Sequence, residues 1–493
     1  MKVILYNPPS SQSRKPILPC SLLALGAVLE GKIDYAILDG NLEPDPLASL
    51  DAHIQAAGPR VVLGVTVMPG PQLQQATPLC RELKRRHPHL TIVWGGYFPT
   101  QHWDVCLKAV YVDFVARGHA EMVFLQLLGE LASGGQAFAA IPGLAYKGAD
   151  GRPVTNALAP IPRPAQLPPF NFERVAVERY VRRTFLGSRT LGYHASYGCP
   201  FFCNFCAVVN LVNGRWLPQT AEQVINVARL YKERWGVNAI EFYDNNFFVH
   251  EKRVAEFAQG VMGWGLAWWG EGRIDTMLKY SDETWRLMRD AGLRMVFMGA
   301  ESGSAETLER MDKGGTLVPE MTLEMARVMQ RWNITPEFSF VMGNPPDPEA
   351  DTRQTMEFIR RVKQVNPAAE IIMYLYTPVP LAGDLYDQAR AQGFAFPETL
   401  EEWISPAWLD FTQRRSQGLP WISYPLHQRL YDFERVLNAY YPTTTDARLT
   451  GFRRAALRSL AAWRYHARVY RFPLELRALH KVMAYQRPET AGF

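Results

Sequence analysis

The chain has 493 residues, enough for about two to four domains with buried cores. Hydrophobic residues make up 47% of it and charged residues 20%, and a formal net charge of +5 does not by itself indicate nucleic acid or a membrane surface. The longest apolar runs, such as 61–68, are too short to span a bilayer, and residues 1–6 read as a strand rather than a signal peptide. Six cysteines in so long a chain predict no disulfide framework, so we expect a cytoplasmic protein.

Residues 1–133 alternate short β-rich runs with stretches of helical periodicity. The expected strands are 2–6, 35–38, 61–66, 91–94 and 114–116, and the expected helices are 21–30, 47–56, 72–86 and 121–131. This alternation predicts a Rossmann-like α/β domain, with a parallel sheet covered by helices on both faces. No G-x-G-x-x-G follows the first strand, so a dinucleotide is not expected.

Ligands of such sheets bind at the carboxyl ends of the strands. The distinctive residues at those ends are Asn7 and Pro8 after the first strand, Thr66, Val67, Met68, Pro71 and Gln72 after the third, Gly95, Gly96 and Tyr97 after the fourth, and Gly118, His119 and Glu121 after the fifth. Glycines there allow close backbone approach. From these residues alone the edge could hold a nucleotide, a flavin or nothing, and His119 is equally suited to contacting a ligand and to capping a helix.

Residues 134–189 read as a connector. The runs 143–146 and 153–155 flank Asp150-Gly151 and predict a hairpin. The proline-rich run 159–170 predicts a semi-rigid, extended segment that packs across the domains on either side of it.

The stretch 192–208 carries half of the cysteines, Cys199, Cys203 and Cys206, spaced C-x3-C-x2-C. A cubane iron–sulfur cluster normally takes four thiolates, so three leave one iron open for chemistry. The alternatives are a structural zinc site, which would need a fourth ligand at short spacing, and three unpaired core cysteines. We favour a [4Fe–4S] cluster held by these three residues.

A second α/β pattern occupies residues 190–382. Its expected strands are 191–196, 239–243, 266–270, 295–299, 337–342 and 371–376, and its expected helices are 221–235, 251–264, 282–291, 305–311, 319–332 and 351–365. Barrel enzymes place their chemistry at strand carboxyl ends. The polar or flexible residues at those ends are Asp244, Asn245, Arg273, Glu301, Ser302, Gly343, Tyr374 and Tyr376. Each alone suits a cap or turn, but in phase at successive strands they predict one site.

Residues 383–493 are expected to be mostly helical. A helix over 385–392 is followed by a proline-bearing stretch with Trp403, Trp408 and Trp421, which either line a pocket or, more commonly, pack in a core. From Thr443 onward, ten Lys and Arg residues stand against three acids. That charge indicates either a solvated helix face or a basic surface for an acidic substrate, carrier or partner.

The cysteine motif, with Phe205 just before its last cysteine, resembles that of the radical S-adenosylmethionine (SAM) enzymes. The sequence around it, from residue 1 to about 386, resembles the cobalamin-binding branch of that superfamily, and especially its class B methyltransferases. The resemblance implies a partial (β/α)6 barrel, a [4Fe–4S] cluster, SAM and cobalamin. It further implies that Gly299-Ala300-Glu301-Ser302-Gly303 matches a G-x-E-S-G turn that contacts SAM, and that Tyr374 and Tyr376 face the substrate as catalytic residues.

Many cobalamin domains bind cobalt through the histidine of a D-x-H-x-x-G motif after the first strand, where this chain has Asn7-Pro8-Pro9. The near match Asp51-Ala52-His53 lies in an expected helix and has Ala56 where the motif needs glycine, so we interpret it as a solvated helix face. The resemblance implies instead that the loop 66–72 covers the lower face of the corrin.

The function that the resemblance implies is C-methylation of an unactivated carbon through a 5′-deoxyadenosyl radical and methylcobalamin. The implied partners are a small-molecule or natural-product substrate and an electron donor such as flavodoxin or ferredoxin, with no nucleic acid and no membrane insertion. Two alternatives stay open: a cobalamin-dependent cyclase or ring-rearranging enzyme without methyl transfer, and a cobalamin or cluster sensor.

Overall fold

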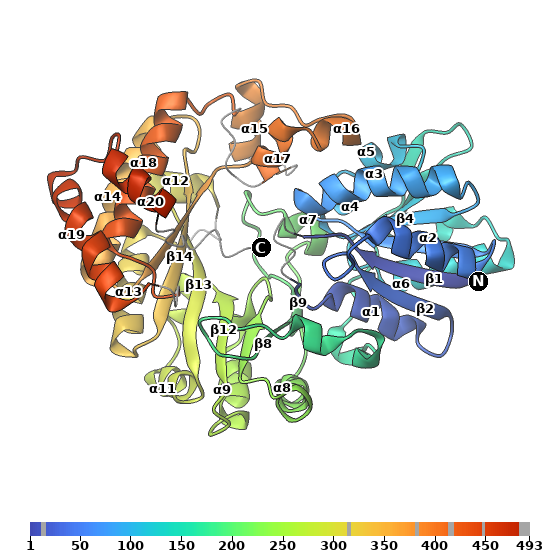
Figure 1. The fold of residues 1–493 in the computed structure, drawn as a ribbon, viewed down its shortest axis with the longest axis horizontal. Coiled ribbons are helices and arrows are strands. Elements are labelled where there is room, and N and C mark those ends of the chain that lie inside the picture. Colours follow the sequence, from blue (N-terminus) through green and yellow to red (C-terminus); the bar gives the residue numbers. More distant parts are fainter. Residues whose placement is uncertain (11–15, 313–316, 380–383, 413–418, 446–448, 483–493) are drawn as a thin grey trace.

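Two α/β units and a helical C-terminal region make up the computed structural model, which describes residues 1–10, 16–312, 317–379, 384–412, 419–445 and 449–482. Figure 1 shows the two units side by side, with α15 (Asp384–Ala391), α16 (Leu400–Trp403) and α17 (Pro406–Thr412) reaching from one to the other. The fold class expected from the sequence is confirmed.

The first unit is a seven-stranded sheet in the order β2-β1-β3-β4-β5-β6-β7. Its strands are β1 (Lys2–Asn7), β2 (Asp34–Asp39), β3 (Val61–Thr66), β4 (Thr91–Gly95), β5 (Phe114–Ala116), β6 (Leu144–Lys147) and β7 (Pro153–Thr155). The first five are parallel, and β6 and β7 form an antiparallel hairpin that extends the sheet. The order reverses between β1 and β3, and open sheets of this kind bind ligands at such a point.

Helices cover both faces of this sheet, as the alternating pattern predicts. They are α1 (Cys20–Leu29), α2 (Pro46–Ala57), α3 (Pro71–Arg86), α4 (Tyr97–Gln101), α5 (Trp103–Lys108) and α6 (Glu121–Ser133). Leu22 of α1 and Phe124 of α6 pack with Leu5 on one face, while Leu50 of α2 and Leu73 of α3 pack on the other. Strands buried on both faces read as near-continuous apolar runs, which is why Val61–Thr66 is so rich in valine and leucine.

The connector contacts both units. Besides the hairpin of β6 and β7, it contains the short 3-10 turns η1 (Phe138–Ala140), η2 (Pro164–Gln166), η3 (Phe172–Arg174) and η4 (Val177–Tyr180). The Arg174 guanidinium forms a salt bridge with Glu30 at the end of α1. On the other side, Gln223 of the second unit donates a hydrogen bond of 3.2 Å to the Ala165 carbonyl. The segment therefore fixes the separation of the two units through contacts with each.

The second unit is a sheet of six parallel strands in the order β15-β14-β13-β12-β11-β8. These strands are β8 (Thr190–Tyr193), β11 (Ala239–Phe242), β12 (Ala267–Gly272), β13 (Leu293–Glu301), β14 (Thr335–Met342) and β15 (Glu370–Leu375). Its helices are α8 (Ala221–Trp235), α9 (Glu251–Gly260), α10 (Ile274–Met277), α11 (Asp282–Asp290), α12 (Ala305–Arg310), α13 (Pro319–Arg331) and α14 (Pro348–Val365), with the 3-10 turn η5 (Phe247–Val249). The six strands follow one another across the sheet in chain order, from β8 at one edge beside β11 to β15 at the other, which is the partial barrel expected.

Two expected elements differ from the structure. The run 191–196 does not form one strand, because β8 ends at Tyr193 and β9 (Ser196–Gly198) turns away to pair with β10 (Trp216–Pro218). The helix expected over 251–264 ends at Gly260, since Gly263 and Gly265 both adopt positive φ although the apolar periodicity continues past them.

The C-terminal region continues with α18 (Tyr424–Tyr440), α19 (Gly451–Ala467) and α20 (Leu474–Val482). The expected domain boundary at 382/383 lies outside the described residues. Of the tryptophans expected in a pocket or a core, Trp403 and Trp421 are buried, and Trp408 packs against Trp403 with ring centroids 4.9 Å apart. Core packing is therefore their role here.

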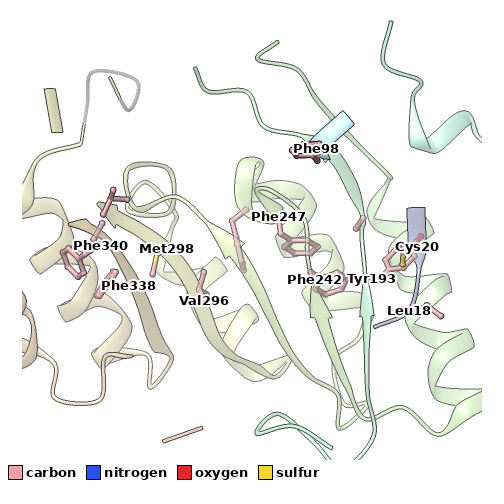
Figure 2. Packing of buried hydrophobic residues seen from close by; sticks show 14 of the residues in the cluster. Leu18, Cys20, Phe98, Tyr193, Phe242, Phe247, Val296, Met298, Phe338 and Phe340 are labelled. Carbon is pink, nitrogen blue, oxygen red and sulfur yellow. The ribbon is translucent and has the colours of Figure 1, made fainter. Parts of the chain in front are cut away.

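One hydrophobic cluster runs through both units. Figure 2 shows Leu18 and Cys20 of the first unit beside Tyr193 and Phe242 of the second. Because this core crosses from one unit to the other, the strand ends of the two sheets are held at a fixed separation. Within the described ranges, no helix has the length and apolar character needed to cross a membrane.

Candidate active site

The carboxyl-end loops of the first sheet meet the cysteine loop of the second unit. Tyr197 of β9 lies two residues before Cys199, and its ring stacks on that of His119 with centroids 4.2 Å apart. The Tyr197 hydroxyl donates a 2.7 Å hydrogen bond to Glu121 at the start of α6. Burial lowers the pKa of His119, so the ring is neutral at neutral pH.

Glycine is required where the chain enters the cysteine loop. Gly198 has φ of +82°, and a Cβ there would lie 2.2 Å from the carbonyl oxygen of Arg215, the residue directly before β10. The other end of the loop leads into the short helix α7 (Val208–Val212). In between, Asn204 binds the end of α12 through a 2.6 Å hydrogen bond to the Arg310 carbonyl.

The three cysteines lie on this one loop and are free of disulfides. Cys203 is buried, and Cys199 and Cys206 are half-buried. Arg273, at the end of β12, places its Nη1 3.4 Å from the Cys203 sulfur. Among the described residues, no three His, Cys, Asp or Glu side chains are already arranged to hold a metal ion.

Arg273 is held rigidly beside the cysteines. Its guanidinium forms two parallel hydrogen bonds of 2.9 and 2.7 Å with Asp275, and it lies 3.6 Å from the centre of the Phe201 ring. Burial disfavours the charge, but the Asp275 carboxylate outweighs it, so the pKa of Arg273 is raised. A positive charge next to thiols favours their thiolate form, which is the form that binds iron.

Asp244, after β11, supports the loop. Its carboxylate accepts hydrogen bonds from the Ala195 backbone, at 2.9 Å, and from the Ser196 hydroxyl. Burial raises its pKa. Asn245, which the sequence analysis selected with it, is exposed.

Asn246 is the residue at this turn that the sequence analysis missed. Its side chain is almost fully buried, and both its amide nitrogen and its amide oxygen have no hydrogen-bond partner within the described residues. A buried amide without hydrogen-bond partners costs free energy unless a ligand or a water molecule forms those hydrogen bonds. Sequence gives little signal for choosing Asn246 over its neighbour, because the turn itself decides which amide points inward.

The turn after β13 has unusual backbone geometry. Glu301 is buried with φ of +63°, a conformation that costs a non-glycine residue about 1–3 kcal/mol, and the strand register shifts beside it. Ser302 is fully buried, and its hydroxyl donates to Asp351 at 3.1 Å and lies 3.1 Å from the Thr355 hydroxyl. Glu301 is thus strained at the strand end, while Ser302 braces the turn against α14.

The tyrosines after β15 differ from each other. Tyr376 is 2% exposed, and its ring packs against Trp421 at 5.8 Å, so it joins the core instead of facing an open site as expected. Tyr374 remains half-buried. Gly343, after β14, has φ of +72° and leaves room for Ile422, whose Cδ1 would be 2.5 Å from a Cβ at this position.

Two further acids line the second sheet and were not selected from the sequence. Glu271 lies two residues after Trp269 in β12, so both side chains point to the same face, and Trp269 Nε1 donates to Glu337 of β14 at 3.1 Å. Burial, with nearby Asp244 and Glu337, raises the pKa of Glu271 to about 8. Burial likewise raises the pKa of Glu337 to about 7.

The strand ends of the first sheet form a connected network. Gln72 donates to Asn7 at 2.8 Å and to the Pro8 carbonyl at 3.2 Å, and it accepts from the Met68 backbone at 2.9 Å. This network fixes the loop 66–72, in which Val67 is buried, Thr66 is half-buried and Met68 is 47% exposed. Pro71 begins α3. His53, in the near match interpreted above as a solvated helix face, is exposed on α2, where its Nδ1 lies 2.8 Å from the Ser49 carbonyl.

Two of the glycines at the same edge have neighbours at ordinary van der Waals distance. A Cβ at Gly95 would meet nothing nearer than 3.4 Å, and one at Gly118 nothing nearer than 3.9 Å. By contrast, Gly96 has φ of +98° and packs over Thr66 and Val67, which fixes the start of α4 at Tyr97. Gly118 lies beside α7, since a Cβ there would be 3.9 Å from the Leu211 carbonyl oxygen.

Comparisons with known proteins agree with this geometry. The B12 binding domain family matches residues 13–128, and the Radical SAM superfamily matches residues 193–359. An uncharacterized methyltransferase of Pyrococcus horikoshii is 25% identical over 73% of this chain and 78% of its own length. The anaerobic magnesium-protoporphyrin IX monomethyl ester cyclase of Synechocystis is 24% identical over 74% of this chain and 72% of its own length.

Among solved structures, the radical SAM methyltransferase TsrM of Kitasatospora setae, with cobalamin and a [4Fe–4S] cluster bound, superposes with a TM-score of 0.63. It is 19% identical, and the match covers 79% of this chain and 78% of TsrM. At this identity the likeness shows the fold.

The two sheets and the thiol-bearing loop between them define a two-domain α/β enzyme whose candidate site lies where the strand ends of both domains meet. The chain combines a B12-binding domain with a radical SAM domain, the arrangement of cobalamin-dependent radical SAM enzymes. Its cofactors are accordingly a [4Fe–4S] cluster, SAM and cobalamin.

The residues present fit these groups. Three thiols on one loop, next to a guanidinium, are suitable ligands for a cluster, although they are not preassembled. The unpartnered amide of Asn246 is a polar group for a ligand at the same strand ends. Gly95 and Gly118 carry no side chain at this edge, which lets a ligand approach the backbone closely.

Proposed function

We propose that the protein transfers a methyl group from SAM to a carbon atom of a small-molecule substrate. The observation that carries this proposal is the meeting of the two strand edges, where Tyr197 joins the cysteine loop to His119 and Glu121 of the B12-binding domain. This arrangement would place groups bound at the two edges within reach of each other. When bound, the cluster and SAM would supply radical chemistry and cobalamin would carry the methyl group.

Each part of the site has a role in this proposal. Cys199, Cys203 and Cys206 would hold the cluster, with Arg273 favouring their thiolates and Phe205 closing the loop over the core. Asn246 and Glu301 would bind SAM, while Asp244 and Ser302 brace the turns around them. Tyr374 is the tyrosine of the pair that would contact substrate.

The first domain would hold cobalamin against these residues. The loop 66–72, fixed by Gln72 and Asn7, would lie under the corrin with exposed Met68 toward it. Met68 is a weak ligand at most, so this loop would shield the metal face while leaving the metal able to react. Gly95, Gly96 and Gly118 would let the backbone approach the ring.

A second candidate is cyclisation or ring rearrangement without methyl transfer, which the match to the Synechocystis cyclase favours. The two functions leave different products from SAM. Radical methyl transfer consumes one SAM as methyl donor, which yields S-adenosylhomocysteine, and another by reductive cleavage, which yields methionine and 5′-deoxyadenosine, whereas cyclisation would yield only the products of reductive cleavage.

The test uses anaerobically reconstituted full-length protein with cobalamin, SAM and a chemical reductant. We expect cobalamin-dependent formation of S-adenosylhomocysteine, measured by mass spectrometry. Methionine and 5′-deoxyadenosine without any S-adenosylhomocysteine would overturn the methyl transfer and favour the cyclase. The Cys203→Ala protein provides the control, since it should lose the iron–sulfur absorbance while Cys80→Ala, a buried cysteine of the first domain, keeps it.

A further inference from the structure

Exposed apolar side chains concentrate in the last two helices. Sixteen large hydrophobic side chains are exposed in the described part of the chain, and six of them fall between residues 452 and 474. We call these six the α19 patch: Phe452 (84% exposed), Leu460 (37%), Trp463 (53%), Val469 (43%), Phe472 (67%) and Leu474 (65%). Single exposed apolar residues are ordinary, but a contiguous group indicates an interaction surface.

The α19 patch follows one face of α19. Phe452, Leu460 and Trp463 are spaced by eight and then three residues, with the exposed alanines Ala456 and Ala467 completing the same helical stripe. A separate face of the helix, with Leu457, Ala461 and Tyr465, is buried, and Tyr465 stacks on Tyr440 of α18 at 4.4 Å. The helix therefore carries two apolar faces, and α18 covers only one.

The turn after α19 extends this surface. Arg464 donates to the carbonyl oxygens of Val469 at 3.2 Å, Arg471 at 3.0 Å and Phe472 at 3.1 Å, which folds the turn over the end of the helix. The same guanidinium lies 4.6 Å from the centre of the Trp463 ring. Since one buried arginine holds both, the turn and the helical stripe form a single surface.

The charges of α19 and of the turn that follows it are predominantly positive. Exposed Arg453 and Arg458 lie on α19 and exposed Arg471 in the turn, whereas the one acid among residues 449–482, Glu475, is half-buried in its salt bridge with Arg464. Arg468 is also exposed and pairs with Glu357. The rim is thus complementary to an anionic surface.

Two other possible binding partners, a second copy of the chain and an electron-donor protein, fit the α19 patch less well. A second copy meeting the patch by two-fold symmetry would bring arginines against arginines. An electron-donor protein would need to approach the cysteines, but Figure 1 shows α19 at the outer edge of the molecule, while β9 and α7 of the cysteine loop lie near its centre. Exposed Phe and Trp beside arginine is the composition of helices that lie in the head-group region of a membrane.

We propose that the α19 patch attaches the enzyme to an anionic phospholipid surface, with Phe452, Trp463 and Phe472 entering the head-group region and the arginines contacting phosphates. The attachment is peripheral and does not require a spanning helix. The evidence for this attachment is the α19 patch alone, and it is independent of the reaction that the enzyme performs.

The experiment measures binding of full-length protein to vesicles by cosedimentation. We expect binding to vesicles of phosphatidylglycerol and phosphatidylcholine, little binding to phosphatidylcholine alone, and weakening as salt rises. The Phe452→Asp/Trp463→Asp protein should bind at least about tenfold more weakly. Each of Arg453→Gln and Arg471→Gln should weaken binding by about fivefold, since one basic residue near an anionic surface contributes about 1 kcal/mol.

The matched control is Val110→Asp, because Val110 is 82% exposed in the first domain and lies outside the patch. It should bind vesicles like the unchanged protein, and all variants should keep the same unfolding midpoint. Equal binding by the double variant and the unchanged protein would overturn the proposal, as would equal binding to neutral vesicles.

Two further outcomes identify other occupants. Dimerisation in sedimentation experiments that Phe452→Asp/Trp463→Asp abolishes, without vesicle binding, would assign the patch to a second copy. Vesicle binding that appears only after removal of residues 483–493 would assign the patch to the chain's own C-terminal segment. Either result overturns the proposal.

Discussion

Tyr197 and Glu121 form a direct hydrogen bond between the two domains of the site. Glu121 is 4% exposed, its Oε1 accepts from Tyr197, and its Oε2 has no partner within the described residues. A buried carboxylate that loses its remaining donor carries the full cost of desolvation. This hydrogen bond therefore positions the cysteine loop relative to the B12-binding domain.

Replacing Tyr197 with Phe should lower the free energy of unfolding by about 1–3 kcal/mol, because it leaves the Glu121 carboxylate unpaired. It should also weaken cobalamin binding, measured by absorbance titration. Glu121→Gln is the matched control, since its amide oxygen still accepts from Tyr197 and its stability should fall less. Unchanged stability in Tyr197→Phe would show that the hydrogen bond does not hold the domains.

Glu271 gives the site a pH dependence. Its folded pKa of about 8 lies above the ordinary value of 4.5, because burial and the neighbouring Asp244 and Glu337 disfavour its charge. A raised carboxyl pKa means that the folded protein holds a proton which the unfolded chain has released. The contribution to stability is therefore complete below about pH 4.5 and is lost as pH rises toward 8.

We expect Glu271→Gln to raise the unfolding midpoint more at pH 8.5 than at pH 5.5, since the amide stays neutral throughout. Scanning calorimetry over this range would measure the difference. Glu283→Gln, at an exposed position of α11, should leave the pH profile unchanged. A profile of Glu271→Gln parallel to that of the unchanged protein would contradict the assignment of a raised pKa.

At the scale of elements, the cysteine loop depends on the hairpin of β9 and β10. Gly198 pairs with Trp216 at the mouth of this hairpin, directly before Cys199, and its positive φ directs the chain into the loop. Asp244 accepts hydrogen bonds from Ala195 and Ser196 where the chain leaves β8 and enters this hairpin. The cysteine loop therefore depends on this turn as well as on the spacing of its three cysteines.

Gly198→Ala should destabilise the protein by about 2 kcal/mol or more, because the left-handed conformation alone costs about 1–2 kcal/mol and the new Cβ would clash with Arg215. Reconstituted iron per chain should fall with it. Gly129→Ala, in α6 with no atom within 4 Å of the added Cβ, should instead stabilise by about 0.5–1 kcal/mol. Full iron content in Gly198→Ala would contradict the role of this turn.

At the scale of the whole molecule, the C-terminal region closes the two domains together. Trp403 of α16 packs against Phe98, with ring centroids 5.1 Å apart, and His102, at 4.7 Å, both in the first domain. Trp421, nearby in sequence, packs against Tyr376 of the second. Arg81 and Glu401 add a surface salt bridge, which contributes little beside this apolar contact.

Trp403→Ala should lower the free energy of unfolding by about 3–5 kcal/mol, as expected for removing a buried aromatic side chain. Because Trp403 joins two domains, we expect the calorimetric transition to split, with the first domain unfolding earlier. Trp463→Ala, at a 53% exposed position, should change little. A uniform shift of a single transition would show that the contact is not an interdomain one.

Sequence periodicity predicted most elements closely, because local pattern and tertiary burial agree there. The helix expected over 72–86 is α3 (Pro71–Arg86). The six strands expected in the second unit are all present, with helices between them. The failures occur where a local feature overrides the pattern, as at the glycines after Gly260 and at the split between β8 and β9. The direction of the side chains at the strand ends was the least predictable feature. The Asn246 amide is buried there, and the Tyr376 ring packs in the core.

The amino-acid sequence by itself determined the two α/β domains, their order, and the C-x3-C-x2-C loop, because periodicity and spacing are local properties of the chain. Only the tertiary structure decided which polar groups meet at the site. Tyr197 contacts Glu121 across 76 positions and Arg273 reaches Cys203 across 70, and the strand carrying each residue is set by packing of the whole core. Long-range contacts of this kind depend on how every layer packs, so no local pattern encodes them.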